Sequence, residues 1–122
     1  NHCGYFGNRA GAPRELAKGY YGLSNQVLDC DWPKVIDGRA RLTETISAFD
    51  DPSDALLSLL LGQGDDRKFS NSFISADTYG TRAATVVLIG TDGEVVFEER
   101  NFGENGSPST SNRFQFTCDD GS

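Results

Sequence analysis

The sequence predicts an α+β domain in which antiparallel strands are combined with two helices, and three features predict it. Apolar residues recur at helical spacing between residues 31 and 49, and a leucine-rich stretch follows from residue 53. A β-branched run, Thr85–Ile89, is joined by a glycine turn to the mixed segment Glu94–Arg100. Because no internal repeat or composition shift divides the 122 residues, we expect one domain.

Residues 31–49 predict the first helix. Asp31 is of a type that caps helices, and Pro33 loses no hydrogen bond in the first turn, where N–H groups have no intrahelical partner. We expect Trp32 to be packed between this helix start and the strand before it. The residues expected to face the core are Val35, Ile36, Leu42, Ile46 and Phe49, and those expected to face solvent are Lys34, Asp37, Arg41, Glu44 and Thr45.

A second helix is expected to begin at Pro52 or Ser53 and to end at Gly62, which would form a left-handed cap. It carries five leucines, at positions 56, 57, 59, 60 and 61. Residues 63–72 are polar and predict a loop.

Short strands are expected before the helices, at His2–Phe6, Glu15–Ala17 and Tyr20–Asn25, since turn-forming residues separate these segments. The last of them ends at a polar Ser-Asn pair. A strand end of this kind leaves side chains outside the ladder of backbone hydrogen bonds.

Strong strand signals follow the helices. Thr85–Ile89 is apolar at successive positions, which is typical of a central strand covered on both faces, and the Asp92-Gly93 turn pairs it with a more polar strand nearer the edge. Residues 101–111 are expected to be flexible. Arg113–Cys118 alternates with period two and predicts a last strand with Phe114, Phe116 and Cys118 on one face.

Composition excludes several functional classes. A net charge of −7 and a pI near 4.5 oppose binding to nucleic acid, and the longest apolar run, Ala55–Leu61, is too short to cross a membrane. Three cysteines without C-x-x-C spacing indicate neither a zinc site nor a disulfide framework, and favour a reducing, cytoplasmic location. With one histidine, a multi-histidine metal centre is hard to build, so no metal and no resident cofactor are expected.

Two ordered blocks resemble a known family. Residues 20–34 include Tyr-Tyr-Gly-Leu-Ser-Asn followed by Asp-Trp-Pro-Lys, and residues 79–86 read Tyr-Gly-Thr-Arg-Ala-Ala-Thr-Val. In this order and spacing they are similar to the transport and Golgi organisation family, also called the NRDE family, and the closing Phe-Gln-Phe-Thr is similar too. The resemblance covers nearly the whole chain. Many members have proline where this chain has Asp31, which we interpret as a local variation at the helix cap.

The resemblance implies a fold larger than this chain. Family members have an N-terminal half with an Asn-Arg-Asp-Glu signature and a cysteine after the initiator methionine, and neither is present here. We therefore expect residues 1–122 to be the C-terminal portion of a single domain, whose first partner is the missing N-terminal part. The implied complete fold is an αββα sandwich like that of the N-terminal-nucleophile (Ntn) hydrolases. This piece alone would leave a sheet edge and an apolar face uncovered.

The resemblance also suggests site residues. Asn25 is similar to the asparagine that Ntn amide hydrolases place beside the nucleophile, where its N–H meets developing negative charge, and Arg82 is similar to their site arginine. We expect these two residues to converge on one pocket that receives an anionic or carbonyl-bearing group. Ser24, Tyr79 and Thr81 are further ligand-binding candidates. A turn, a cap or an ion pair is the plainer alternative for each.

Three functions remain open at this point. Relatives of the family are linked to the movement of haem and to acyl-CoA or lipid handling, which implies binding and trafficking of a small-molecule ligand. The alternative is an Ntn-type amide hydrolase whose cysteine nucleophile, with its free α-amine as base, lies in the missing part. A structural fragment that is stable only with its other half is the third possibility.

Overall fold

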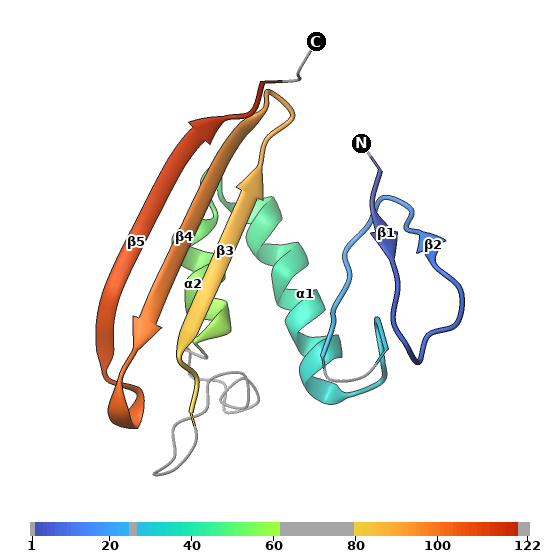
Figure 1. Ribbon diagram of the computed structural model, residues 1–122, viewed down its shortest axis with the longest axis horizontal. Helices are drawn as coiled ribbons and strands as arrows, with labels where there is room; N and C mark the ends of the chain where they lie inside the picture. Colours follow the sequence, from blue (N-terminus) through green and yellow to red (C-terminus); the bar gives the residue numbers. More distant parts are fainter. Residues whose placement is uncertain (1, 25–26, 62–79, 120–122) are drawn as a thin grey trace.

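The computed structural model describes residues 2–24, 27–61 and 80–119, and it confirms the α+β class with two helices and antiparallel strands. Figure 1 shows two layers, a three-stranded sheet and a pair of helices, with a small hairpin set apart from the sheet beyond α1. The elements in chain order are β1 (Gly4–Tyr5), β2 (Arg14–Glu15), α1 (Pro33–Ala48), α2 (Ser53–Leu60), β3 (Ala83–Ile89), β4 (Glu94–Phe102), the 3₁₀ helix η2 (Glu104–Gly106) and β5 (Pro108–Thr117).

The main sheet has the strand order β3-β4-β5, with both pairs antiparallel. The predicted hairpin is confirmed, with Thr85 opposite Glu99 and Ile89 opposite Val95. Gly93 closes the turn with a φ of 84°, a left-handed conformation that glycine adopts without a steric penalty. Its backbone carbonyl also accepts a 2.8 Å hydrogen bond from the N–H of Cys118, which joins the turn to the end of β5.

The predicted order of the strands is wrong for the described part of the chain, because β4 is central and β3 lies at an edge. Two interpretations of the sequence led to the wrong strand order. The polar residues of β4 suggested an edge, whereas Glu98 is buried and paired with Arg113 of β5. Residues 101–111 were expected to be flexible, whereas they complete β4, form η2 and begin β5.

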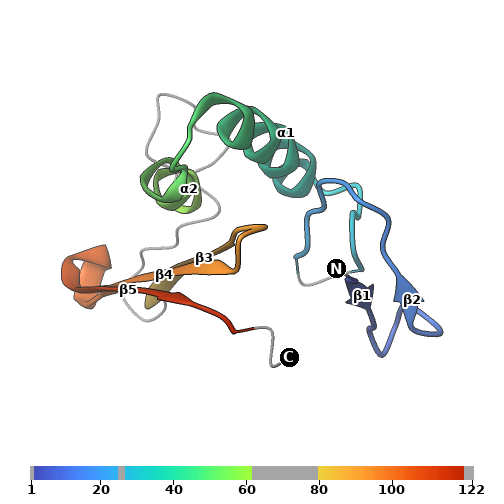
Figure 2. The same ribbon diagram turned by 90° about the horizontal axis from the view of Figure 1, so that it is seen from above.

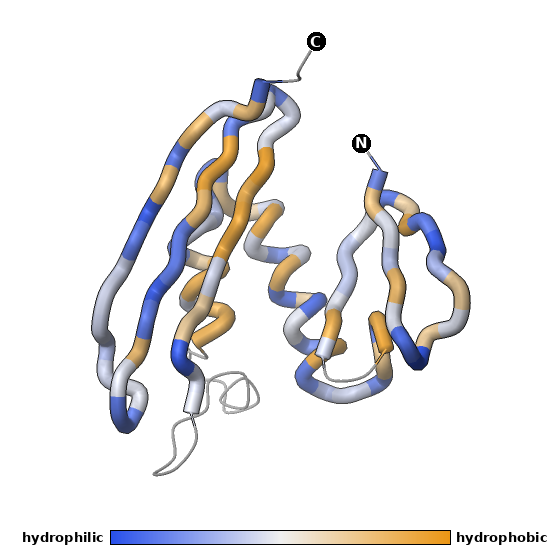
Figure 3. The backbone as a smooth tube through the Cα atoms, in the orientation of Figure 1, coloured by the Kyte–Doolittle hydropathy of each residue, from blue (hydrophilic) through white to orange (hydrophobic). Residues whose placement is uncertain are grey.

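The two faces of this sheet differ in what covers them. Figure 2 shows both helices on the same side. On that side Ala84 and Val86 are buried against Leu57 of α2, which is completely inaccessible to solvent. Figure 3 shows that hydrophobic residues concentrate on β3 and α2, while the middle of β4 is hydrophilic. The core is therefore a small contact between α2 and β3.

The opposite face is open and partly apolar. Register places Ile89, Val95 and Phe116 in one cross-strand row and Val87, Phe97 and Phe114 in the next. Four of these six residues, Val87, Ile89, Phe114 and Phe116, have exposed fractions between 50% and 74%. The Phe97 and Phe114 rings lie 6.4 Å apart between centroids. The expectation that β3 is covered on both faces is thus wrong for the described residues.

Pro33 lies in the first turn of α1 as the sequence predicts, but the helix begins one residue later than expected from Asp31 as its cap, and its surroundings differ. Trp32 occupies the cap position without a side-chain hydrogen bond, so Asp31 is not the cap, and Trp32 is 39% exposed instead of packed. Only Val35 is buried, while Ile36 and Phe49 are exposed. The reason is that α2 lies directly on β3 and α1 packs beside α2, which leaves most of the apolar side of α1 without a sheet beneath it.

The described part of the predicted strand Tyr20–Asn25, residues 20–24, is not a strand. The Gly22 N–H donates to Asp29 Oδ1 at 2.7 Å, and the Asp29 N–H donates to the Gly22 carbonyl at 2.7 Å. These two bonds close a loop, so the backbone polar groups of Gly22 are satisfied without a neighbouring strand. The first two predicted strands are present but shorter, as the two-residue pair β1 and β2.

A polar network attaches the start of α2 to the sheet. Arg113 donates to Glu98 Oε2 at 2.8 Å, to the Ser53 hydroxyl at 3.1 Å and to Asp51 Oδ2 at 3.3 Å. Asp51 Oδ1 accepts from the backbone N–H and from the hydroxyl of Ser53. Beside it, Arg100 pairs with Asp54 at 3.1 Å. The second helix thus begins at Ser53 as predicted, held by side chains of β4 and β5; Gly62, its expected cap, lies outside the described residues.

Within the described ranges, neither helix is long and apolar enough to span a bilayer. The αββα sandwich expected for the complete domain stays a prediction, since the described residues form one helical layer on one face of the β3-β4-β5 sheet, with the two-stranded β1-β2 sheet apart from it.

The network makes stability sensitive to acid. Hydrogen bonds from the Ser53 hydroxyl and backbone N–H, with a further contribution from Arg113, hold the pKa of Asp51 below its ordinary value of 3.8 despite the opposing effect of desolvation. A depressed pKa contributes stability that is present above the unfolded-state pKa and is lost as pH falls through the folded-state value. We predict that Asp51→Asn lowers the urea midpoint at neutral pH and flattens its decline below about pH 4.

The matched control is Asp50→Asn, which removes the exposed neighbouring carboxylate outside this network. The urea midpoints of the two variants are compared by circular dichroism at a series of acid pH values. Identical pH profiles for the two variants would contradict the assigned role of Asp51.

Candidate functional site

A cleft of about 510 Å³ runs along β3, on the edge that no strand of the described residues pairs, and it has the size typical of small-ligand sites, roughly 300–1,000 Å³. A loop, the helices α1 and α2, and the edge of β3 form its walls. The lining residues are Tyr21, Gly22, Leu23 and Ser24 from the loop, Lys34, Val35, Gly38, Arg39 and Leu42 from α1, Leu56, Leu59 and Leu60 from α2, and Thr85, Val86 and Val87 from β3.

Helical spacing explains the α1 wall. Lys34, Gly38 and Leu42 are four residues apart, and Val35 and Arg39 repeat the same interval, so all five lie on one stripe of the helix. This wall presents two cationic side chains on an otherwise apolar surface. The leucines of α2 extend the apolar surface toward β3.

The loop wall is fixed to α1 through Asp29. Besides its two hydrogen bonds with Gly22, Asp29 pairs through Oδ2 with Arg39 at 3.2 Å. Asp29 has a φ of 54°, an uncommon left-handed conformation for a residue other than glycine. The backbone of Gly22 lies against Val35, where a Cβ at position 22 would come within 2.8 Å of Val35 Cγ1. Glycine is therefore required at this approach of loop and helix.

The two cations of the cleft differ in what they contact. Arg39 is paired with Asp29, whereas the Lys34 ammonium lies 5.3 Å from the centroid of the Trp32 ring. No carboxylate of the described residues forms an ion pair with Lys34. A ring face leaves the other sides of an ammonium free for hydrogen bonds, so Lys34 is the cation that an incoming anion would meet.

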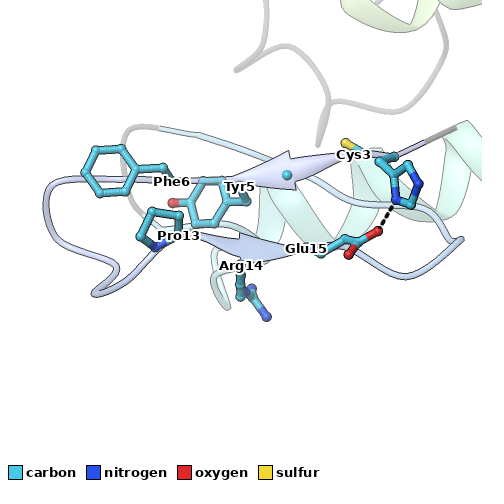
Figure 4. A pocket seen from close by; sticks show the side chains of 8 residues that line it. Cys3, Tyr5, Phe6, Pro13, Arg14 and Glu15 are labelled. Atoms are coloured by element: carbon cyan, nitrogen blue, oxygen red, sulfur yellow. Dashed lines mark hydrogen bonds and ion pairs between the residues drawn. The ribbon is translucent and has the colours of Figure 1, made fainter.

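A second hollow, of about 540 Å³, lies on the β1–β2 hairpin. Figure 4 shows that its side chains, among them Tyr5, Phe6, Pro13 and Glu15, all come from this one hairpin. The imidazole of His2 and the carboxylate of Glu15 form a hydrogen bond there, and both side chains are largely exposed. Because no second element closes over this hollow, the cleft beside β3 is the stronger candidate.

The structure places some of the site residues expected from the sequence. Ser24 lines the cleft, and Arg82 is exposed and immediately precedes β3. The Arg82 carbonyl accepts a 2.8 Å hydrogen bond from the Phe102 N–H. Neither Thr81 nor Arg82 is among the described lining residues of the cleft. Asn25 and Tyr79 lie outside the described residues, so the expected convergence of Asn25 and Arg82 stays a prediction.

Sequence reasoning missed the α1 wall. Lys34 was expected to face solvent, whereas it is half-buried and lines the cleft. The signal was present in the interval of four between Lys34 and Gly38, and it was hidden because a lysine on an amphipathic helix usually lies on the solvated side. In the part of the chain that the structure describes, no cluster of three or more histidine, cysteine or acidic side chains has a geometry suited to a metal ion.

Comparison with known proteins decides the family. The sequence model of the family described as Transport and Golgi organisation 2 matches residues 1–104. The chain belongs to the Transport and Golgi organisation 2 family. The resemblance of residues 20–34 and 79–86 to this family is thereby confirmed. The Ntn-hydrolase-like fold that the resemblance also implied stays a prediction.

Three mammalian relatives carry this family name. The Bos taurus Transport and Golgi organization protein 2 homolog is 33% identical over 121 residues, the Mus musculus Transport and Golgi organization 2 homolog 30% over 138, and the Homo sapiens homolog 31% over 121. The matches cover 80%, 93% and 80% of this chain, but 44%, 50% and 44% of the relatives. The chain thus spans about half the length of the curated relatives it matches.

The approach of the loop to α1 predicts an asymmetry between two glycines of the cleft. Gly22→Ala places a methyl group against Val35, so we expect a loss of about 1–3 kcal/mol in the free energy of unfolding, the usual cost of overpacking. Gly38→Ala is the control, since a Cβ built there has no heavy atom of the described residues within 4 Å apart from its chain neighbours and the nearby backbone of its own helix. Equal urea midpoints for the two variants would contradict the close approach at Gly22.

Proposed function

We propose that this chain forms part of a binding and trafficking protein for a small amphipathic anion. The candidate ligands of this class are a long-chain acyl-CoA, a related lipid and haem. The observation that carries the proposal is the pairing of an apolar wall with Lys34 in one cleft. A ligand with an apolar body and an anionic group satisfies both. The carboxylates of haem and the phosphates of an acyl-CoA share this chemistry, so direct binding measurements must separate them.

The apolar part of the cleft supplies the affinity in this proposal. Leu42 of α1 and Leu56, Leu59 and Leu60 of α2 line it together with Val86 and Val87 of β3. Each methylene of a ligand that leaves water on this surface gains about 0.8 kcal/mol. An acyl chain or a porphyrin face offers many such contacts, whereas a small polar metabolite offers none.

Lys34 supplies orientation. A charge-assisted hydrogen bond from its ammonium to a carboxylate or phosphate is stronger than one between neutral groups. Arg39 is engaged by Asp29, so it contributes positive potential to the cleft while it holds the loop. The chain as a whole has a net charge of −7, whereas the lining of the cleft carries two cationic side chains.

The word transport is part of the names of the relatives, which is consistent with a carrier. We further propose that the protein acts in a reducing compartment such as the cytoplasm. The three cysteines at positions 3, 30 and 118 are free thiols, as that location requires.

The alternative, an Ntn-type amide hydrolase, finds less support among the described residues. Of its two catalytic candidates, Arg82 does not line the cleft, and Asn25 lies outside the described residues. The cysteine nucleophile that this reaction needs would lie in the other half of the family domain. Carrier function therefore remains the proposal.

We also propose that the open face of β3-β4-β5 is covered by the other half of the family domain. The chain spans about half of its relatives, and the rows through Phe114 and Phe116 expose an apolar surface opposite the helices. A second sheet laid on this face would bury these side chains at the usual sheet-to-sheet spacing of about 10 Å.

The carrier proposal predicts a charge effect at position 34. Palmitoyl-coenzyme A and haemin, titrated separately by isothermal titration calorimetry, should show at least one saturable site, and Lys34→Glu should weaken it about tenfold or more, because it replaces a favourable charge contact by repulsion. Lys18→Glu makes the same change of charge at an exposed position outside the cleft and should leave affinity unchanged. Equal effects of both variants would point to non-specific attraction and would refute the site.

The covering of the open face predicts association with the upstream half of the family domain. Mixed with that polypeptide, this chain should form a one-to-one complex by light scattering, and Phe114→Ser with Phe116→Ser should abolish it without lowering the unfolding midpoint, since both rings are exposed here. Self-association of the chain, with no complex in the mixture, would refute the assignment of the upstream half to this face.

A further inference from the structure

Gly38 is an unusual residue for its position. It lies in the interior of α1, ten residues before the helix ends at Ala48, where glycine is disfavoured relative to alanine. The cost is about 1 kcal/mol, and natural helices retain an interior glycine where a turn, a positive φ or a close approach requires one. Gly38 has helical backbone geometry, so neither of the first two reasons applies.

The third reason, a close approach of other protein atoms, does not apply to Gly38 among the described residues either. Apart from its chain neighbours and the nearby backbone of its own helix, a Cβ built on Gly38 meets no heavy atom of the described residues within 4 Å, in contrast to Gly22, where Val35 Cγ1 lies at 2.8 Å. Two glycines thus line one cleft, and only one of them is required by neighbouring side chains. No other element of the described residues fills the space over Gly38, and Gly38 lines the cleft.

The position of this space is informative. Gly38 lies four residues after Lys34 and four before Leu42 on the cleft-facing stripe of α1, midway between the cation and the apolar wall. An amphipathic anion held at its charged end by Lys34 must pass Gly38 before its apolar body reaches Leu42. The missing side chain leaves a gap at that passage.

We infer that Gly38 is a specificity-determining residue, the point at which the backbone of α1 is in direct contact with the ligand. This inference rests on the proposed function of the cleft and names the place where a side chain would exclude the ligand. It also sets a steric condition on the ligand: the part next to the anionic group that Lys34 holds needs the space that a side chain at position 38 would fill.

The test uses substitutions of increasing size at position 38. Gly38→Ala should raise the thermal midpoint by a few degrees, because alanine favours the helix, and Gly38→Leu should leave the midpoint at or above that of the original chain. Gly38→Leu should weaken binding of palmitoyl-coenzyme A or haemin by about tenfold or more, because its side chain fills the space the ligand needs. Ala40→Leu is the matched control, since it adds bulk at an exposed position of the same helix outside the cleft.

The outcomes separate this inference from the carrier proposal. If the original chain binds neither titrant, the proposed function fails and this inference fails with it. If it binds, and Gly38→Leu binds equally well, only the role of Gly38 is refuted. A lower thermal midpoint for Gly38→Leu than for Ala40→Leu would show that protein atoms occupy the space, and would also overturn the inference.

Discussion

The buried carboxylate of Glu98 is the constraint on which the arrangement of sheet and helices depends. Its side chain is 9% exposed in the middle of the central strand, where a charge without a partner would cost several kcal/mol. Arg113 of the neighbouring strand supplies that partner and at the same time contacts Ser53 and Asp51 at the start of α2. One guanidinium therefore fixes the register of β4 with β5 and the place where α2 meets the sheet.

Leu57 completes this attachment on the apolar side. The polar network positions the first turn of α2, and Leu57, one turn later, enters the gap over Ala84 and Val86. The second helix then supports the first, and α1 in turn holds the loop through Arg39 and Asp29. The shape of the cleft therefore depends on a series of contacts that begins at the centre of the sheet. Its two ends are chemically different because α1 supplies the cations and α2 the leucines.

Local signals in the sequence predicted the features that depend on neighbouring residues alone. The turn at Gly93, the start of α1 at Pro33 and the start of α2 at Ser53 follow from residue types at fixed positions, and the structure confirms them. Strand order could not be predicted, since it depends on a pair, Glu98 with Arg113, that are fifteen positions apart. Polar residues in β4 resemble an edge when their partners are unknown. The strand expected at residues 20–24 is absent for a more local reason, because Gly22 and Asp29, seven positions apart, hydrogen-bond to each other.

Family-level similarity found the blocks around Ser24 and Arg82, while the cleft itself required three-dimensional information. Its wall combines a stripe of α1 with leucines of α2 and the edge of β3, and no short motif records such a combination. Lys34 illustrates the difficulty, because the same spacing that makes a helix amphipathic assigns its lysines to water. Only the position of α2 beside α1 shows that this flank of the helix borders a cavity.

The open face of the sheet has a consequence for colloidal behaviour. Exposed aromatic side chains on β5 and an edge of β3 that no strand of the described residues pairs are two features that lead sheets to stack and to extend from one molecule to the next. A net charge of −7 opposes both processes by mutual repulsion between copies. That repulsion disappears near the pI of 4.5 and is screened by salt, so acidity and ionic strength set the concentration at which copies of this chain remain separate.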